Sequence, residues 1–490
     1  MRRFDVAIIG GGAVGSAVAY LLSAYDLQVA VIEKEPDVAL GTSGRNSAVV
    51  HAGFNNRPGS LMAELCVEGN LGFAALCRTL DVPYRRTGKL VVGFGDEDAR
   101  ALEALLRTGE QNGCVGLSLI DGAAVREREP YVSATMAMLS ENTAVINPFL
   151  YNIHLAECAA QNGVAYLLGR EVTGIRRQGG TFFVTAGEET VQADFLVNAA
   201  GLFADRVSAM AGDPSYTIYP CRGEYYLLDK AAGERVAMPV YPVPRPGVGG
   251  LGVHLTPTVD GNVLIGPSAE YVTGREDTAT TPAMLDRLWQ EAAALHGGLD
   301  RRDIIGAYAG VRAKLVAKGQ ANYGDFVIEE SPKVEGLIQL VGIESPGLTA
   351  SLPIARRVEA MLVRHLRPAR RAGCDLTYRR APSFAESDAA ERARLIAEDP
   401  DYGEIVCRCE LVTRAEVLRA LRNPLGATAL VSVKNRTRAT MGRCNGGYCF
   451  TRMVDILRQE LGLVPEQIAL KAQGDRPIDG QMRGVPACDR

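Results

Sequence analysis

Four cysteines near the C-terminal end are the residues whose spacing most clearly suggests chemistry. Cys407 and Cys409 are one residue apart, and after residues 410–443 come Cys444 and Cys449, four residues apart. Two close pairs of thiols can complete a sulfur site on each of two irons. Four thiolates also suit one zinc ion. The pattern therefore predicts a metal or redox centre, with a two-iron cluster and zinc as alternatives and unliganded thiols as a third reading.

A glycine pattern at the other end of the chain predicts a dinucleotide site. Gly10, Gly12 and Gly15 follow a short apolar run at 5–9, and residues 16–27 are expected to form a helix. These glycines permit a tight turn, a close approach of the backbone to a pyrophosphate and close packing of helix on strand. Glu33 ends the next expected strand, where its carboxylate can accept both ribose hydroxyls. Strand, helix, strand and acid in register fit NAD or FAD.

Two later segments bear on that choice. Residues 41–53 form a small-residue loop that can lie along an extended cofactor, and 194–205 reads as a buried strand entering a small-residue turn. Together these blocks resemble the glycine-oxidase/D-amino-acid-oxidase superfamily, which implies FAD. The resemblance, with Gly10, Gly12, Gly15 and Glu33, implies further FAD contacts at Thr42, Ser43, Asn46, Ser47, Val172, Ala200, Gly201, Gly342, Gly347, Leu348 and Thr349.

Further motifs narrow the resemblance, which covers most of residues 4–366. HAGFNNRPGSLMAELCVEGN at 51–70, TGKLVV at 87–92, RGEYYLL at 222–228, LGVHLTPTVDGNVLIGPSAE at 251–270 and YAGVRAK at 308–314 resemble L-2-hydroxyglutarate dehydrogenases. The segment 324–351 is similar to glycerol-3-phosphate dehydrogenases and oxidases. Both relatives oxidise a secondary alcohol beside an anionic group.

The resemblance implies a set of catalytic residues. Oxidation of an alcohol needs a base for the hydroxyl proton, and histidine suits that step near neutral pH. His51 lies in the loop that the family places beside the flavin and is the first candidate, with His254 second, orienting the substrate oxygen. Arg312 and Lys314 are the candidate cations for an anionic substrate, because a guanidinium can hold a carboxylate with two hydrogen bonds. Surface ion pairs are the alternative role for these cations.

The cysteine segment carries its own resemblance. IVCRCELVT and MGRCNGGYC resemble the bacterioferritin-associated-ferredoxin-like [2Fe-2S] domain, and the one-residue gap in CRC is tighter than usual zinc knuckles. This favours a [2Fe-2S] cluster over zinc. Apolar residues recur at helical spacing in ELVTRAEVLRALR and FTRMVDILRQELG, so a helix is expected near each cysteine pair.

The expected architecture is α/β. A Rossmann-like FAD domain is expected to be interleaved with an α+β substrate domain built on an antiparallel sheet, followed by a small helical cysteine-cluster domain. The expected boundaries are an FAD-binding domain at 1–80, 145–215 and 335–366, a substrate domain at 81–144 and 216–334, a linker at 367–400, a cluster domain at 401–465 and a tail at 466–490.

Composition limits the partners. With 490 residues, 47% hydrophobic residues and a formal net charge of -4, nothing indicates nucleic acid. The apolar N-terminal stretch resembles a targeting segment, but Asp5 and the glycine spacing argue against one. A cytoplasmic location is therefore expected, with attachment to a membrane through a partner as the alternative and no transmembrane segment.

These parts predict a dehydrogenase of a small anionic alcohol, with L-2-hydroxyglutarate as first substrate and sn-glycerol-3-phosphate as second. Electrons would pass as hydride to FAD, then singly through the cluster to an acceptor protein or quinone-linked subunit. Two alternatives remain. The enzyme is an amine or amino-acid dehydrogenase, or the cysteine domain is a sensor or a docking module for partners and carries no electrons.

Overall fold

The N-terminal segment folds as a β-α-β unit at the centre of a mixed sheet. Strand β1 (Arg3–Ile9) leads into helix α1 (Ala13–Leu22) and then β2 (Val29–Ile32), and β2 pairs with β1 in parallel. The order of the expected elements is confirmed, although α1 begins and ends earlier than the sequence indicated. Apolar residues bury both faces of β1, as in strands covered by helices.

The computed structural model describes residues 1–244, 252–320, 324–471 and 475–480. The chain divides into two units, the first comprising 1–34 and 38–379 and the second comprising 35–37 and 380–490. Part of the expected tail at 466–490 lies outside the described residues.

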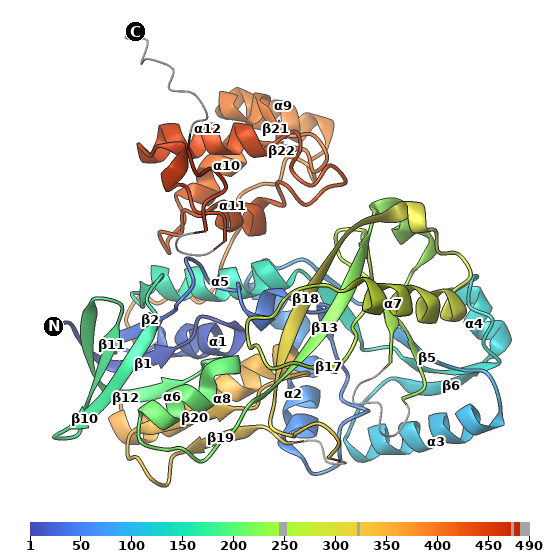
Figure 1. The fold of residues 1–490 in the computed structure, drawn as a ribbon, viewed down its shortest axis with the longest axis horizontal. Coiled ribbons are helices and arrows are strands. Elements are labelled where there is room, and N and C mark those ends of the chain that lie inside the picture. Colours follow the sequence, from blue (N-terminus) through green and yellow to red (C-terminus); the bar gives the residue numbers. More distant parts are fainter. Residues whose placement is uncertain (245–251, 321–323, 472–474, 481–490) are drawn as a thin grey trace. The chain divides into compact units, whose positions relative to one another are not determined.

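The sheet around β1 has eight strands, shown in Figure 1. Its main order is β10-β11-β12-β1-β2-β9, and β20 and β19 extend from β12. The strands not yet defined are β9 (Ala165–Leu167), β10 (Val172–Gln178), β11 (Thr181–Ala186), β12 (Glu189–Asn198), β19 (Val327–Glu330) and β20 (Leu337–Val341). The sequence analysis placed 327–330 in the substrate domain, whereas β19 forms a hairpin with β20 in this sheet.

Helices bury the apolar face of this sheet. Helix α1 packs against α5 (Pro148–Gln161) and α8 (Gly347–Leu366), and α8 also packs against α2 (Leu61–Thr79). A shorter helix, α6 (Ala204–Met210), follows β12. Gly69 of α2 lies so close to α8 that an added Cβ would be 2.0 Å from the Thr349 carbonyl oxygen. The N-terminus of α8 is therefore fixed against α2.

A second, nine-stranded sheet forms the other half of the first unit. Its order is β17-β13-β16-β15-β14-β5-β7-β6, with β18 also paired to β13. Its pairs are antiparallel except for β14 with β5. The strands are β5 (Lys89–Gly93), β6 (Leu117–Asp121), β7 (Met136–Ser140), β13 (Tyr219–Leu228), β14 (Val240–Pro242), β15 (His254–Pro257), β16 (Val263–Gly266), β17 (Glu270–Tyr271) and β18 (Ile304–Lys314).

Helices and short segments complete this half. Helices α3 (Asp96–Gln111), α4 (Gly122–Arg128) and α7 (Pro282–Leu295) pack on the second sheet. A small sheet orders β3 (Val49–Val50), β8 (Ala144–Ile146) and β4 (Tyr84–Arg85). The described 3-10 helices of this unit are η1 (Thr42–Gly44), η2 (Gly201–Phe203), η3 (Lys230–Arg235) and η4 (Arg301–Asp303).

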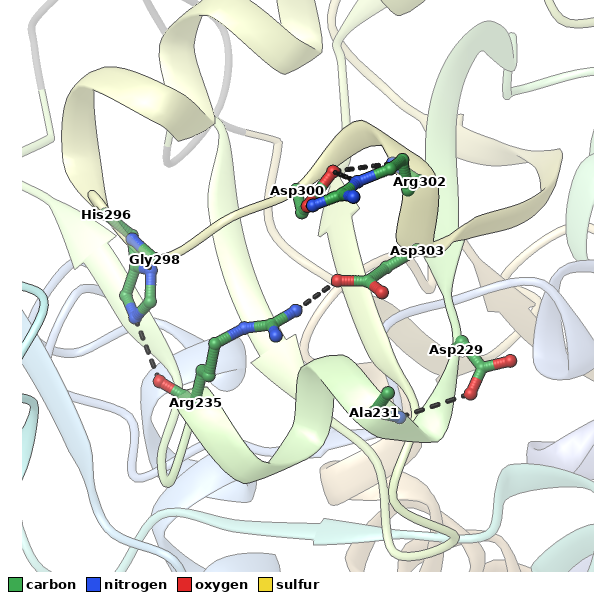
Figure 2. Close-up of polar contacts among 8 residues, drawn as sticks. All are labelled: Asp229, Ala231, Arg235, His296, Gly298, Asp300, Arg302 and Asp303. Atoms are coloured by element: carbon green, nitrogen blue, oxygen red, sulfur yellow. Dashed lines mark hydrogen bonds and ion pairs between the residues drawn. The ribbon is translucent and has the colours of Figure 1, made fainter.

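Polar contacts link three segments next to the second sheet, as Figure 2 shows. His296, just after α7, donates from Nε2 to the Arg235 carbonyl at 3.1 Å, and the Arg235 guanidinium bonds Asp303. Arg302 and Asp300 form a further pair within η4. These contacts join η3, the end of α7 and η4, so His296 has a structural role.

The second unit is a small helical domain. It contains α9 (Ala389–Glu398), η5 (Pro400–Gly403), β21 (Ile405–Cys407), β22 (Val412–Thr413), α10 (Arg414–Leu421), α11 (Leu430–Thr437), α12 (Phe450–Leu461) and η6 (Pro465–Gln467). Thr413 and Glu416 form a capping box at the start of α10. The helix expected near each cysteine pair is confirmed: α10 follows the first pair and α12 follows the second. Helix α9 lies in the stretch expected to be a linker, and its Leu395 is buried with Tyr402.

Candidate active site

The turn between β1 and α1 has the geometry of a phosphate-binding loop. Gly10 has φ +109°, and a Cβ there would be 2.4 Å from the Ala199 carbonyl oxygen. A Cβ at Gly15 would be 2.0 Å from the Gly10 carbonyl oxygen. Gly12 caps α1, which has no side-chain cap and no acidic residue in its first turn. The N–H groups of this helix start that no side chain caps can therefore bind an anion.

Two side chains complete this loop. The Glu33 carboxylate accepts from the Gly11 N–H at 2.6 Å, so it lies beside the loop at the end of β2. Ser43 Oγ accepts from the Ala13 N–H at 2.9 Å and brings the 41–47 segment to the same helix start. Asn152 of α5 donates to the Gly11 carbonyl at 3.0 Å; the sequence patterns did not indicate this contact.

The 41–47 segment also contacts the substrate half. Thr42 Oγ1 donates to the Val311 carbonyl at 2.7 Å, and the Tyr308 hydroxyl donates to the Asn46 carbonyl at 2.9 Å. Both partners are on β18. Asn46 folds back on its own loop through the Ser43 carbonyl and the Ala48 N–H. Ser47 lies within hydrogen-bonding range of the buried Tyr225. This loop therefore joins the two sheets.

Other predicted cofactor residues are distributed around β1. Val172 begins β10 and packs in the same apolar cluster as Ala200, which follows β12. Gly201 has φ +53°, and the space around its missing side chain is open. This open, small-residue turn is suited to lie against a flat ring or a ribose.

The N-terminus of α8 is placed beside His51. Gly342 has φ +70° and Gly347 starts the helix, where Leu348 also lies. The helix has no side-chain cap and no acidic residue in its first turn. Thr349 Oγ1 accepts from the His51 N–H at 3.0 Å. The positive end of the helix dipole is therefore available beside the His51 loop.

The two predicted histidines lie close enough to influence each other. Burial lowers the pKa of His51 well below its ordinary value, and Lys89 and His254 lower it further. The His51 residue keeps some accessible surface. Burial lowers the pKa of His254 to about 3. Both imidazoles are therefore neutral near pH 7, and each has a ring nitrogen that can accept a hydrogen bond.

The tautomer of His254 follows from its contacts. Its Nδ1 is 2.9 Å from the Gly252 carbonyl oxygen, which can only accept, so Nδ1 carries the proton. Nε2 then has a free lone pair, and it is buried without a hydrogen-bond partner among the described residues. Tyr241 stacks on this ring at 3.7 Å between centroids. His254 is thus a fixed acceptor.

The two predicted cations differ in availability. Arg312 donates to the Ser268 carbonyl at 3.1 Å and has no carboxylate partner among the described residues. Its charge contributes to lowering the pKa of His254. Lys314 is bound by both carboxylate oxygens of Glu344, at 2.9 and 3.1 Å. Arg312 can therefore receive an anion, whereas Lys314 anchors the loop before α8.

One charged residue near the histidines was missed by the sequence analysis. Lys89 at the start of β5 is 2% exposed, and its ammonium lies over the rings of Phe54 and Tyr241 at 4.4 and 4.3 Å. The available signal was a lysine opening the apolar run KLVV. Such a residue is more often an exposed strand end, so nothing in the sequence indicated a buried ammonium.

The four cysteines of the second unit lie in two pairs. Cys407 interacts with Cys449, and Cys409 with Cys444. The Cys449 thiol and nearby backbone N–H groups lower the pKa of Cys407 to about 6. A hydrogen bond from the Tyr448 N–H is the main cause that lowers the pKa of Cys444. Amides directed at sulfur stabilise thiolates, which are the metal-binding form.

This pairing bears on the choice of metal. Among the described residues, no three His, Cys, Asp or Glu side chains are placed to hold one metal ion, as a mononuclear zinc site requires. Two separate pairs instead provide two thiolates for each of two irons. The donor set fits a two-iron cluster.

Comparison with known families agrees with both sites. A model of the FAD dependent oxidoreductase family matches residues 5–361. The chain belongs to this family. A second model, the BFD-like [2Fe-2S] binding domain, matches residues 405–459. This FAD-dependent oxidoreductase therefore carries a [2Fe-2S] domain, and both cofactors expected from the sequence are confirmed.

Individual relatives cover different parts of the oxidoreductase. A glycerol 3-phosphate dehydrogenase of Caloramator mitchellensis is 38% identical over 480 residues, covering 97% of this chain and 98% of the relative. The mitochondrial L-2-hydroxyglutarate dehydrogenase of Homo sapiens is 36% identical over 289 residues, 56% of this chain and 62% of the relative. The chain thus spans about three-fifths of that human protein.

Solved structures include a dithionite-reduced L-alpha-glycerophosphate oxidase of Mycoplasma pneumoniae with FAD bound. Its TM-score is 0.72 at 29% identity, covering 78% of this chain and all of that one. None of the described helices is both long and apolar enough to cross a membrane. The chain is thus an FAD-dependent oxidoreductase whose relatives include dehydrogenases.

Proposed function

We propose that this enzyme oxidises a small anionic secondary alcohol, with sn-glycerol-3-phosphate as the first candidate substrate. The observation that carries the proposal is the juxtaposition of two neutral imidazoles, His51 and His254, with the guanidinium of Arg312, which no carboxylate of the described chain neutralises. A base and a free cation in one buried site suit an alcohol that carries a negative charge.

Each residue has a role in this proposal. His51 accepts the proton of the substrate hydroxyl. His254 positions the same oxygen, because its Nε2 is a fixed acceptor. Arg312 holds the anionic group and thereby orients the substrate carbon that loses hydride. FAD, when bound, supplies the hydride acceptor. Thr349 and Lys314 keep the α8 start beside His51.

Two observations rank the substrates differently. The sequence motifs placed L-2-hydroxyglutarate first. The relative that aligns along almost the whole chain, including the cysteine domain, is a glycerol 3-phosphate dehydrogenase, and this favours the phosphate substrate. The planar guanidinium of Arg312 also fits a carboxylate in a bidentate manner, so L-2-hydroxyglutarate is the second candidate.

We further propose that the [2Fe-2S] domain passes electrons from the flavin to an acceptor protein or a quinone-linked subunit. Two redox centres in one chain support this role, since a one-electron cluster has no use in direct hydride transfer. We also propose that the enzyme is cytoplasmic, as the sequence indicates.

The test is anaerobic addition of each substrate separately to the purified holoenzyme, following loss of the oxidised flavin absorbance. Fast bleaching by sn-glycerol-3-phosphate alone supports the first candidate, and bleaching by L-2-hydroxyglutarate alone supports the second. If neither compound bleaches the flavin, the proposed substrate class is wrong. A His51→Gln variant that bleaches as fast as the wild type would remove His51 as the base.

A further inference from the structure

Lys89 is a buried cation for which the described chain provides no counter-ion. The residue is 2% exposed, and its ammonium has no hydrogen bond or ion pair with any described residue. The ammonium instead makes cation–π contacts with Phe54 and Tyr241. Aromatic faces stabilise an ammonium only in part, because they replace neither the water that it has lost nor an anionic partner.

The location of Lys89 connects it with the candidate active site. On β5, Leu90 and Val92 pack into one apolar cluster, whereas Val91 belongs to the cluster of Phe54 and Tyr241. Because side chains alternate along a strand, Lys89 shares the face of Val91. That face meets the segment just after His51, where Phe54 lies, and the ring that stacks on His254.

Other buried polar atoms lie near Lys89. His254 Nε2, the Tyr241 hydroxyl and Thr256 Oγ1 are all buried; Nε2 has no hydrogen-bond partner among the described residues, whereas the two hydroxyls lie close to each other. Buried polar groups in native proteins are nearly always hydrogen-bonded to protein, water or a ligand. Their presence on neighbouring strands β14 and β15, beside an uncompensated ammonium, indicates a site that receives a polar, negatively charged molecule.

We propose that Lys89 contacts the substrate and holds its anionic group, a carboxylate or a phosphate, in a subsite bordered by Tyr241 and His254. The inference rests on the proposed function, because it assigns the charge of that substrate to a particular residue. Lys89 is then a second cation in the same site as Arg312. Lys89 comes from β5 and Arg312 from β18, which lie in different parts of the sheet.

The other titratable groups that face Lys89 keep their charge over the pH range in which Lys89 titrates. They are His51, His254, Cys66 of α2 and Cys114 after α3. Burial lowers the pKa of Lys89 to about 7, and it lowers that of His254 to about 3 and that of His51 well below normal. Burial raises the pKa of Cys114 to about 11 and that of Cys66 further. Between pH 6.5 and 9, therefore, Lys89 alone of these groups changes its charge.

Calorimetry of ligand binding tests the proposal independently of turnover. Glutarate and sulfate, which do not titrate between pH 6.5 and 9, are added separately to the holoenzyme at pH 8 in buffers with different ionisation enthalpies. The wild type is expected to bind at least one of them and to take up a proton as it binds, because the anion favours charged Lys89. The matched control is Lys333→Met, which removes an exposed lysine.

Lys89→Met is expected to weaken binding by at least tenfold at pH 6.5 and to abolish the proton uptake at pH 8, while FAD content stays that of the wild type. Unchanged affinity in Lys89→Met, binding of neither anion by the wild type, or wild-type binding without proton uptake would overturn the proposal. If Lys89→Met does not fold, the proton uptake of the wild type still tests whether the anion binds beside Lys89. Lys89-dependent binding in an enzyme that neither substrate bleaches would show that the subsite exists and that the proposed function is wrong.

Discussion

Breaking the ion pair between Lys314 and Glu344 should destabilise the loop before α8, and restoring neutrality should reverse the effect. Both side chains are about nine-tenths buried, with side-chain exposures of 9% and 10%, and the two oxygen contacts are 2.9 and 3.1 Å. Removing one partner of such a pair leaves a buried charge, which costs about 3–5 kcal/mol. Lys314→Met should therefore be strongly destabilising.

The double variant Lys314→Met with Glu344→Gln removes the buried charge. It should recover most of the loss and lie within about 1–2 kcal/mol of the wild type, because the two side chains form one interacting unit. As a surface control, Arg356→Met breaks an exposed pair with Glu68 and should cost less than about 1 kcal/mol.

The assay is the thermal midpoint of the holoenzyme, together with the affinity for FAD and the KM for whichever substrate bleaches the flavin. The single variant should lower the midpoint by roughly 5–10 °C and weaken FAD binding, and the double variant should restore both. The reasoning is refuted if the double variant is as unstable as the single. A raised KM that persists in a stable double variant would instead make Lys314 a substrate ligand, as the sequence suggested.

Three further predictions follow from individual contacts. Gly15→Ala should abolish FAD retention, because its Cβ would lie 2.0 Å from the Gly10 carbonyl oxygen, whereas Gly72→Ala, with open space on α2, should retain FAD; equal flavin content would contradict this. Burial raises the pKa of Glu129 from 4.5 to about 7, so folding takes up a proton in that window and stability falls as pH rises through it. Glu129→Gln should therefore raise the free energy of unfolding at pH 8 by up to roughly 3 kcal/mol, and much less at pH 5, as followed by the thermal midpoint; a pH-independent gain would disprove the cause. Cys444→Ser should lose iron and take up one electron fewer per chain in an anaerobic reductive titration, with flavin bleaching by substrate unchanged; an unchanged electron count would exclude Cys444 as a cluster ligand.

The sequence alone determined those features that depend on local backbone geometry or on short spacings. Gly10, Gly12 and Gly15 predicted the phosphate-binding turn because only glycine permits such close backbone approaches, and Glu33 followed at the fixed length of a β-α-β unit. The cysteine spacing predicted two close sets of thiols, since residues two or five positions apart remain close, but the pairs that form, Cys407 with Cys449 and Cys409 with Cys444, join the two motifs and depend on the fold. His51 and His254 are candidates that motifs alone indicated, and their catalytic roles stay predictions.

Only the tertiary structure decided which charged groups are paired and which are buried. Lys314 and Arg312 are two residues apart on one strand and look equivalent in sequence, yet Glu344, thirty positions away from Lys314, neutralises Lys314 and leaves Arg312 available. Lys89 could not be recognised because its burial depends on Phe54, Tyr241 and His254, which belong to other parts of the chain. The charge state of a side chain is set by the desolvation and the partners that long-range packing imposes, and residue order does not contain these until the chain folds.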